Sequence, residues 1–277
     1  MNPKEGLRLR SPTIELWPQG HPSETDGLTP EGRWGFLNEQ VVWVSHNSLD
    51  DSRSAIRIPE GLGWHGRRRI APSELAAGNH HYQEGQQWSL SEDGLQYRDC
   101  PISNAFGPSP GLVSARVELV DEEIVRIGIA VENDSGRPLE NVTVHVCFNH
   151  RRSPMLGRRL FVQTASGWTD FRQYHQYFVT NSDSIRYDLR GERNPGALPR
   201  VTQPLLFSET VHEKADFVSV IGSRDATAIA SNITWPCTDA TLDFGDLLPR
   251  ARTERDLYIG LGPGSRDAWL DRMARLL

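Results

Sequence analysis

The clearest pattern in the chain is an alternation of apolar and polar residues that occurs three times within residues 114–150. In the third run the apolar residues that share one face are Val142, Val144, Val146 and Phe148. A period of two residues is typical of a strand with one buried face. The segments between the runs, residues 121–123 and 133–138, are rich in residues that stabilise turns. The pattern predicts three successive strands, an antiparallel meander, within an all-β antiparallel β-sandwich.

Shorter apolar stretches predict further strands on both sides of this region. They are residues 8–17, 40–45, 159–162, 177–181, 217–221, 228–230 and 256–259. The stretches 217–221 and 228–230 are expected to form a hairpin with a long loop. Residues 56–87 lack periodicity and are interpreted as a long, structured loop. Ser265 is a suitable N-cap for a short C-terminal helix at about 266–276, whose apolar residues recur at helical spacing.

Composition limits the class of protein. With 277 residues, of which 37% are hydrophobic, the chain can bury a sizeable core, and we expect one domain over residues 1–277. The net charge of -6 and the absence of long basic runs argue against a nucleic-acid partner. No stretch approaches the ~20 apolar residues of a membrane span, so we expect a cytoplasmic protein that binds no membrane. The widely spaced Cys100, Cys147 and Cys237 indicate reduced thiols rather than a disulfide framework or a zinc ribbon.

The loop at 56–87 concentrates residues suited to acid–base chemistry. His81 is the preferred base and Tyr82 the preferred acid, because an imidazole can accept a proton near neutral pH while a phenol donates one. Three neighbours, His65, His80 and Glu84, are expected to bind the substrate. The alternative interpretation is a polar loop whose histidines lie at the surface, since their spacing matches no fixed metal or catalytic motif.

The strand at 141–150 offers a second group of candidates. His145 and His150 are an odd number of residues apart and therefore face opposite sides of a regular strand, with Cys147 on the side of His145. We consider His150 a catalytic candidate. Arg152, just past the strand end, is a candidate for binding an anionic or hydroxyl-rich ligand, although arginines at strand ends are most often solvated.

A third group lies between two tyrosines. His175 is a catalytic candidate and Tyr177 a candidate for stacking on a sugar ring, while a core aromatic patch is the alternative. Because functional loops commonly lie across the end or face of a sheet, we expect this third group to surround one solvent-open groove together with His80, His81, Tyr82 and His150.

Two pairs of segments carry a resemblance to a known group. They are ENDSG at 132–136 with NVT at 141–143, and WPC at 235–237 with DFGDLLP at 243–249. Over residues 110–265 the chain resembles uncharacterised bacterial β-sandwich proteins that are similar in form to the galactose mutarotase-like, or supersandwich, carbohydrate-active group. The resemblance implies a concave sheet that holds a saccharide, with histidine, tyrosine or carboxylate groups moving protons in an epimerase or lyase reaction.

Three functions therefore remain open. The leading one is a carbohydrate-active enzyme that uses acid–base chemistry on a small-molecule or oligosaccharide ligand. The second is a non-catalytic saccharide-binding sandwich, and the third is a metal-dependent enzyme whose ligands are clustered histidines. No cofactor is expected in the first two, whereas the third requires a divalent metal. The sequence does not determine the sugar, the metal ligands or the oligomeric state.

Overall fold

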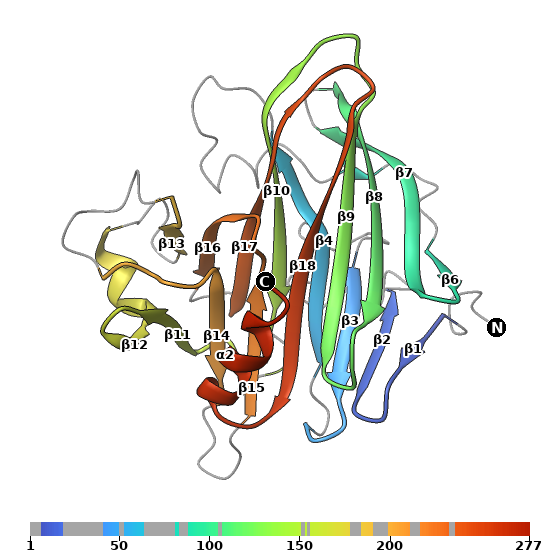
Figure 1. Ribbon diagram of the computed structural model, residues 1–277. Helices are drawn as coiled ribbons and strands as arrows, with labels where there is room; N and C mark the ends of the chain where they lie inside the picture. Colours follow the sequence, from blue (N-terminus) through green and yellow to red (C-terminus); the bar gives the residue numbers. More distant parts are fainter. Residues whose placement is uncertain are drawn as a thin grey trace, which may run out of the picture.

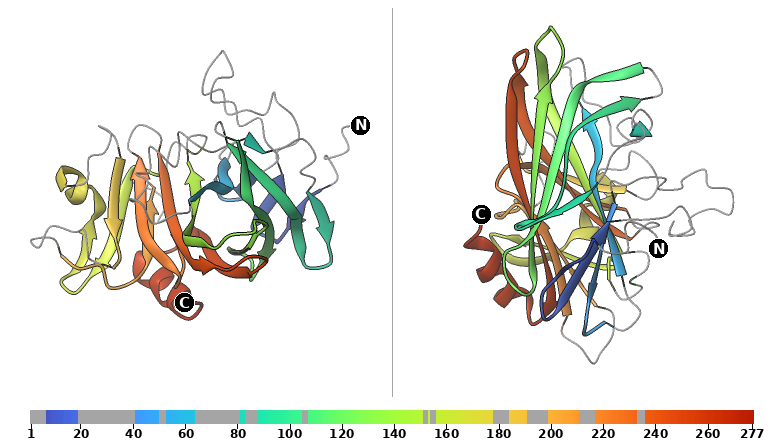
Figure 2. Two further views of the ribbon diagram at one scale, coloured as in Figure 1. Left: turned by 90° about the horizontal axis from the view of Figure 1, so that it is seen from above. Right: turned by 90° about the vertical axis from the view of Figure 1, so that its right-hand side faces the viewer.

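The computed structural model of the chain describes residues 7–18, 41–49, 53–63, 81–82, 88–104, 107–150, 153, 156–177, 184–190, 199–210, 217–232 and 236–277. These residues form two antiparallel sheets that face each other, and one α-helix lies outside them (Figure 1 and Figure 2). The predicted all-β antiparallel sandwich with a short C-terminal helix is confirmed.

Within the described residues the first sheet has eight strands. They are β1 (Leu9–Arg10), β2 (Ile14–Pro18), β3 (Val41–His46), β4 (Arg53–Gly63), β10 (Leu139–Asn149), β13 (Ser184–Asp188), β16 (Ala226–Asn232) and β17 (Cys237–Leu247). Their order across the sheet is β1-β2-β3-β4-β10-β17-β16-β13. The strands β4, β10 and β17 are therefore neighbours at the centre of this sheet, although they come from distant parts of the chain.

The second sheet has ten strands within the same residues. They are β5 (His81–Tyr82), β6 (Ser89–Ser91), β7 (Gly94–Asn104), β8 (Gly107–Leu119), β9 (Ile124–Asn133), β11 (Arg159–Thr164), β12 (Gly167–Asp170), β14 (Leu205–Glu209), β15 (Phe217–Gly222) and β18 (Arg252–Pro263). Their order is β12-β11-β14-β15-β18-β9-β8-β7-β5, and β6 pairs with β7. A 3₁₀ helix, η2 (Phe171–Tyr177), follows β12, and the helix α2 (Arg266–Ala274) follows β18.

The core fills the space between the two sheets. On β10 the predicted apolar face is fully buried, with zero exposure for Val142, Val144, Val146 and Phe148. These side chains belong to one apolar cluster with Val117, Ile127 and Ile129 of the ten-stranded sheet. The alternation in the sequence therefore identified the inward-facing side of this strand correctly.

The predicted meander is wrong in one respect. The strands β8 and β9 pair, but β10 leaves their sheet and lies between β4 and β17 in the other one. The buried side chain of Asn133 fixes this crossing, because its amide nitrogen donates to the carbonyl oxygens of Arg137 at 2.7 Å and Leu247 at 2.9 Å. Alternation predicts a strand with one buried face, and such a strand can pack in either sheet of a sandwich.

The expected hairpin at 217–221 and 228–230 is also wrong, for the same reason. Both stretches are strands, but β15 pairs with β14 and β18 in the ten-stranded sheet. In contrast, β16 pairs with β13 and β17 in the eight-stranded sheet. The connection between them therefore crosses the sandwich instead of reversing within one sheet.

The segment interpreted as a loop at 56–87 is partly strand. Strand β4 extends to Gly63, and a register shift opposite the segment between His145 and Cys147 interrupts its alternation. This irregularity breaks the period of residues 56–63 in the sequence. Residues 64–80 and 83–87 lie outside the described residues. Tyr177, expected in a strand, belongs to η2, and the remainder of that expected strand at 178–181 also lies outside the described residues.

The C-terminal helix covers the outer face of the ten-stranded sheet (Figure 2). The hydroxyl of Ser265 caps it by accepting a hydrogen bond from the backbone N–H of Ala268 at 3.3 Å. Trp269 and Met273 are buried against the sheet. Their close approach requires Gly260, where a Cβ atom would lie 2.4 Å from the Trp269 ring. Among the described residues no helix is long and apolar enough to cross a membrane.

Candidate functional site

The face of the eight-stranded sheet that points away from the core carries a group of polar side chains. Because Val144 and Val146 point inward, His145 and Cys147 point outward on β10. In the ladder, Cys147 pairs with Asp239 of β17, and His145 pairs with Thr241. Strand β4 flanks β10 on its other side and contributes Glu60. We call the group formed by Glu60, His145, Cys147, Cys237 and Asp239 the outer-face cluster.

An imidazole lies between two carboxylates in this cluster. Nε2 of His145 is 3.3 Å from Oε2 of Glu60 and 3.8 Å from Oδ2 of Asp239. On the other side of the ring, Nδ1 is 3.1 Å from the hydroxyl of Thr241. The position of Glu60 is fixed in turn by an ion pair with Arg57. The ring is thereby oriented with one nitrogen toward the acids and the other toward a neutral hydroxyl.

The surroundings move the proton affinities of these groups. Burial alone lowers the pKa of His145, but the hydrogen bond with Glu60 and the charge of Asp239 outweigh it, so its pKa lies above the ordinary 6.5. Burial raises the pKa of Asp239 to about 6, with the charge of Glu60 adding to the effect and His145 opposing it. Near neutral pH the cluster therefore holds one group that can donate a proton and another that can accept one.

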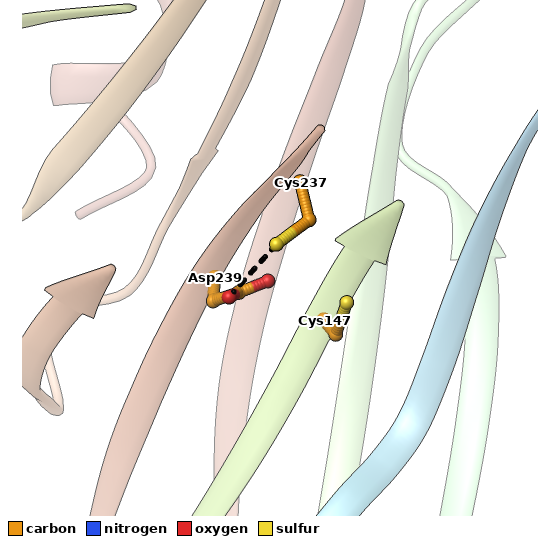
Figure 3. A group of neighbouring side chains, drawn as sticks. All are labelled: Cys147, Cys237 and Asp239. Carbon is orange, nitrogen blue, oxygen red and sulfur yellow. Dashed lines mark hydrogen bonds between the residues drawn. The ribbon is translucent and has the colours of Figure 1, made fainter. Parts of the chain in front are cut away.

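Two thiols stand beside this pair (Figure 3). Sγ of Cys237 donates to Oδ2 of Asp239 at 3.1 Å. A hydrogen bond with Cys237 and burial raise the pKa of Cys147 well above its ordinary value. The hydrogen bond from Cys147 lowers the pKa of Cys237, but burial and Asp239 outweigh it and raise the value to about 11. Both thiols are therefore protonated at neutral pH.

An apolar patch borders the cluster on the same face of the sheet. Trp43 and Val41 are buried there, with Trp17 packed against them. The guanidinium of Arg53 lies over the Trp43 ring, 4.8 Å from its centroid. Ala55, the ladder partner of Trp43, also pairs with Asn149 of β10, so the patch and the cluster are adjacent along the ladder. Aromatic, cationic and anionic groups thus share one sheet face.

His150 lies on the opposite side of β10, in the core. Its exposure is zero, and its ring nitrogens are 3.0 Å from the hydroxyl of Ser54 and 3.2 Å from that of Thr238. Burial lowers the pKa of His150 to about 3, so the ring is neutral at physiological pH. This interior position differs from the expected place beside a solvent-open groove. The prediction that His145 and His150 face opposite sides is confirmed.

The remaining sequence candidates are spread over other parts of the chain. His81 and Tyr82 form β5, which pairs with β7 at one edge of the ten-stranded sheet. His175 and Tyr177 lie in η2, directly after β12 at the opposite edge, with seven strands between β12 and β5. The backbone therefore places these two groups apart, against the expectation of one shared groove (Figure 1). The other candidates lie outside the described residues: His65, His80, Glu84 and Arg152.

Sequence reasoning did not identify three members of the outer-face cluster. Glu60 fell within the expected loop, and Cys237 and Asp239 were not assigned to any strand. A signal for β17 was present, because Ala240, Leu242 and Phe244 alternate with polar residues. That alternation would have placed Asp239 on a polar face. It would not have shown that this face continues the face of His145, since only strand pairing decides which faces meet.

Several solved structures are similar to the chain at low sequence identity. One is a galactose mutarotase related enzyme from Lactobacillus acidophilus, with 11% sequence identity and a TM-score of 0.45. The match covers 94% of this chain and 98% of that chain. A candidate aldose 1-epimerase from Klebsiella pneumoniae has 11% identity, covers 95% of this chain and 87% of that chain, and also has a TM-score of 0.45. A mutant heparan sulfate lyase from Pedobacter heparinus has 6% sequence identity and a TM-score of 0.35, and the match covers 94% of this chain and 37% of that chain. No protein-family model and no curated protein matches the chain.

Proposed function

We propose that the chain is a carbohydrate-active enzyme that moves protons at a saccharide in an epimerase-like reaction. The acid–base groups are His145, Glu60 and Asp239. The observation that carries the proposal is the imidazole held between two carboxylates, at 3.3 and 3.8 Å, on the outward face of a central strand. A catalytic acid and base work best when their pKa values lie near the working pH. In this cluster the pKa of His145 and the pKa of Asp239 are both raised, toward neutral pH.

The reaction that suits this geometry is the opening and closing of a cyclic hemiacetal. Opening removes one proton from the anomeric hydroxyl and delivers one to the ring oxygen, and both oxygens are bonded to the same carbon. The acid and the base must therefore lie close together. Protonated His145 donates to the ring oxygen while the carboxylate of Asp239 accepts from the hydroxyl. Closure on the other face of the carbonyl reverses both transfers, so no net proton is consumed.

Glu60 has a supporting role in this scheme. Its carboxylate contacts both Arg57 and Nε2 of His145, so it stabilises the protonated imidazole. Asp239 is the better base, because burial raises its pKa to about 6, whereas the carboxylate of Glu60 is held in an ion pair with Arg57.

The saccharide class is supported by the sequence resemblance and by the composition of this face. Carboxylate oxygens accept hydrogen bonds from sugar hydroxyls, and guanidinium groups such as that of Arg57 donate them. In the neighbouring patch Trp17 is only partly buried and offers apolar surface to a sugar ring, while Trp43, against which it packs, is buried. These groups fit a neutral polyhydroxylated ligand better than they fit an apolar one.

The test is a screen of aldoses in which polarimetry monitors the rate at which the anomers interconvert. Chromatography then identifies the products. His145→Gln and Asp239→Asn are each expected to reduce kcat by ~10²- to 10⁴-fold, the usual contribution of a positioned acid or base. Glu118→Gln, which removes a carboxylate on β8 of the other sheet, is the matched control. In wild type, activity should rise with pH through about 6 as Asp239 ionises, and Asp239→Asn should abolish this rise.

Other outcomes separate the competing functions. Full activity in His145→Gln together with loss in His81→Ala and Tyr82→Phe would transfer the chemistry to β5. Saccharide binding by calorimetry without any turnover would identify a non-catalytic binding sandwich. An unsaturated sugar product would identify a lyase.

A further inference from the structure

The outer-face cluster contains donor atoms that proton transfer does not use, namely the two thiols. We propose that Cys147, Cys237 and Asp239 bind a divalent, thiophilic metal ion, with Zn²⁺ as the best fit. Metal binding at this site needs no saccharide, although the site shares Asp239 with the proposed acid–base pair, and it differs from the histidine-based metal site that the sequence left open.

The strand ladder itself brings the three donors together. Cys147 of β10 and Asp239 of β17 are direct ladder partners, and Cys237 lies two residues before Asp239 on the same face. As a result, the two Sγ atoms and a carboxylate oxygen all lie within 4.8 Å of one another (Figure 3). Two paired strands at the centre of a sheet hold these positions more rigidly than loops would.

The dimensions suit a tetrahedral zinc ion. With Zn–S bonds of ~2.3 Å and Zn–O bonds of ~2.0–2.2 Å, the donor atoms of such a site lie about 3.5–3.8 Å apart. The donor atoms already lie within 4.8 Å of one another, and side-chain rotation can bring them to this separation. Thiolates with one carboxylate favour zinc over magnesium or calcium, which prefer all-oxygen sites.

A second observation points to a cation at the same place. Asp239 is only 7% exposed, and its Oδ1 is buried with no hydrogen-bond partner among the described residues. A buried carboxylate with an unpartnered oxygen is costly, and a metal ion offsets this cost directly. The adjacent thiols would lose their protons when the metal binds, and the resulting thiolates would share in balancing the charge of the ion.

A disulfide is the main competing role for two neighbouring cysteines, and the register argues against it. The ladder partner of Cys147 is Asp239, while that of Cys237 is Asn149, so the cysteines are diagonal neighbours. Diagonal Cα atoms in an antiparallel pair are ~7–8 Å apart, beyond the usual span of a disulfide. Both cysteines are free and buried. Their shared geometry therefore suits a bridging ion better than a covalent bond.

His145 is outside the proposed ligand set. Its Nε2 is engaged with Glu60 at 3.3 Å and lies farther, at 3.8 Å, from Oδ2 of Asp239. Three protein ligands leave one coordination position for an exogenous group, as is common in catalytic rather than structural zinc sites. That position would lie near His145, and Asp239 belongs to both proposals, so the test of the metal site is made without sugar and its ligands are assigned chiefly by the two cysteine variants.

The test uses the full chain, stripped with a chelator and reloaded with Zn²⁺ in the absence of sugar. We expect one equivalent to bind by elemental analysis after gel filtration. We also expect wild-type protein loaded with Co²⁺ to show a thiolate-to-cobalt charge-transfer band in the near ultraviolet. Because both thiols must lose their protons, calorimetry in buffers of different ionisation enthalpy should report two protons released per zinc at pH 7.5.

Variants then assign the ligands. Cys147→Ser, Cys237→Ser and Asp239→Asn should each lose equimolar zinc binding, and the two cysteine variants should lose intensity in the cobalt band. Cys100→Ser removes the other buried cysteine, on β7, and should bind like wild type. His145→Gln should also retain one equivalent.

The proposal is overturned if wild type binds no zinc and shows no cobalt charge-transfer band, a result that needs no variant to fold. Loss of binding in His145→Gln or Cys100→Ser would overturn the ligand assignment. None of these measurements involves a sugar, so failure of the metal site and failure of the proposed catalysis are distinguishable.

Discussion

Replacing His150 by glutamine should change how the stability of the protein depends on pH. His150 is fully buried between the sheets, and burial lowers its pKa from 6.5 to about 3. The unfolded chain therefore binds a proton below pH ~6.5 that the folded protein does not bind until about pH 3. The contribution of the neutral ring to stability is complete above pH ~6.5 and is lost as the pH falls.

The size of this loss follows from the two pKa values. At pH 7 few unfolded molecules carry the proton, and the effect is only ~0.2 kcal/mol. At pH 5 protonation favours the unfolded state by about 2 kcal/mol, since each pH unit below 6.5 adds up to ~1.4 kcal/mol. His150→Gln lacks this proton but retains an amide that can bond with the hydroxyls of Ser54 and Thr238.

The assay is urea unfolding at pH 7 and pH 5, with the free energy of unfolding obtained by linear extrapolation. Between the two pH values wild type should lose about 2 kcal/mol more than His150→Gln, whatever the absolute stability of the variant. Thr238→Val removes one hydroxyl partner and no titrating group, so its pH dependence should follow wild type. Equal losses in wild type and His150→Gln, within about 0.5 kcal/mol, would show that His150 titrates normally in the folded protein.

Three further substitutions test other parts of the structure. Val144→Asp should lower the free energy of unfolding by more than ~4 kcal/mol, because Val144 is fully buried and an unpaired carboxylate would enter the core; an unchanged melting temperature would contradict this. Asp239→Asn should gain thermal stability relative to wild type as the pH rises from about 4 to about 6, since the raised pKa of Asp239 makes wild type lose stability over that range; a constant difference between the two melting curves would contradict it. Gly260→Ala should cost ~1–3 kcal/mol, because its methyl group would overlap the ring of Trp269, and a neutral result in urea unfolding would show that α2 can move away.

The outer-face cluster shows why a site can be clear in the structure and inconspicuous in the sequence. His145 and Cys147 were recognised as sharing a face, because the period of β10 is regular. Their partners on β17 lie about ninety residues further on, and Glu60 belongs to a strand whose period is broken by a register shift. No spacing rule connects these positions, since ladder partners can be separated by any length of chain. The prominent His80-His81-Tyr82 sequence attracted the initial interpretation instead, although only the backbone of its last two residues is described, at a sheet edge.

By itself the sequence determined the strand-forming segments of the centre of the chain, their buried faces and the capped C-terminal helix. These features depend on local periodicity and on side chains within a few residues of each other, so they are written in short windows. The tertiary structure decided which sheet each strand joins, as for β10 after β9 and for β16 after β15. It also decided that His150 lies inside the core and that His145 meets Glu60 and Asp239. The physical reason is that an alternating strand gains the same burial in either sheet, so the choice depends on pairing and packing with distant segments that no local pattern encodes.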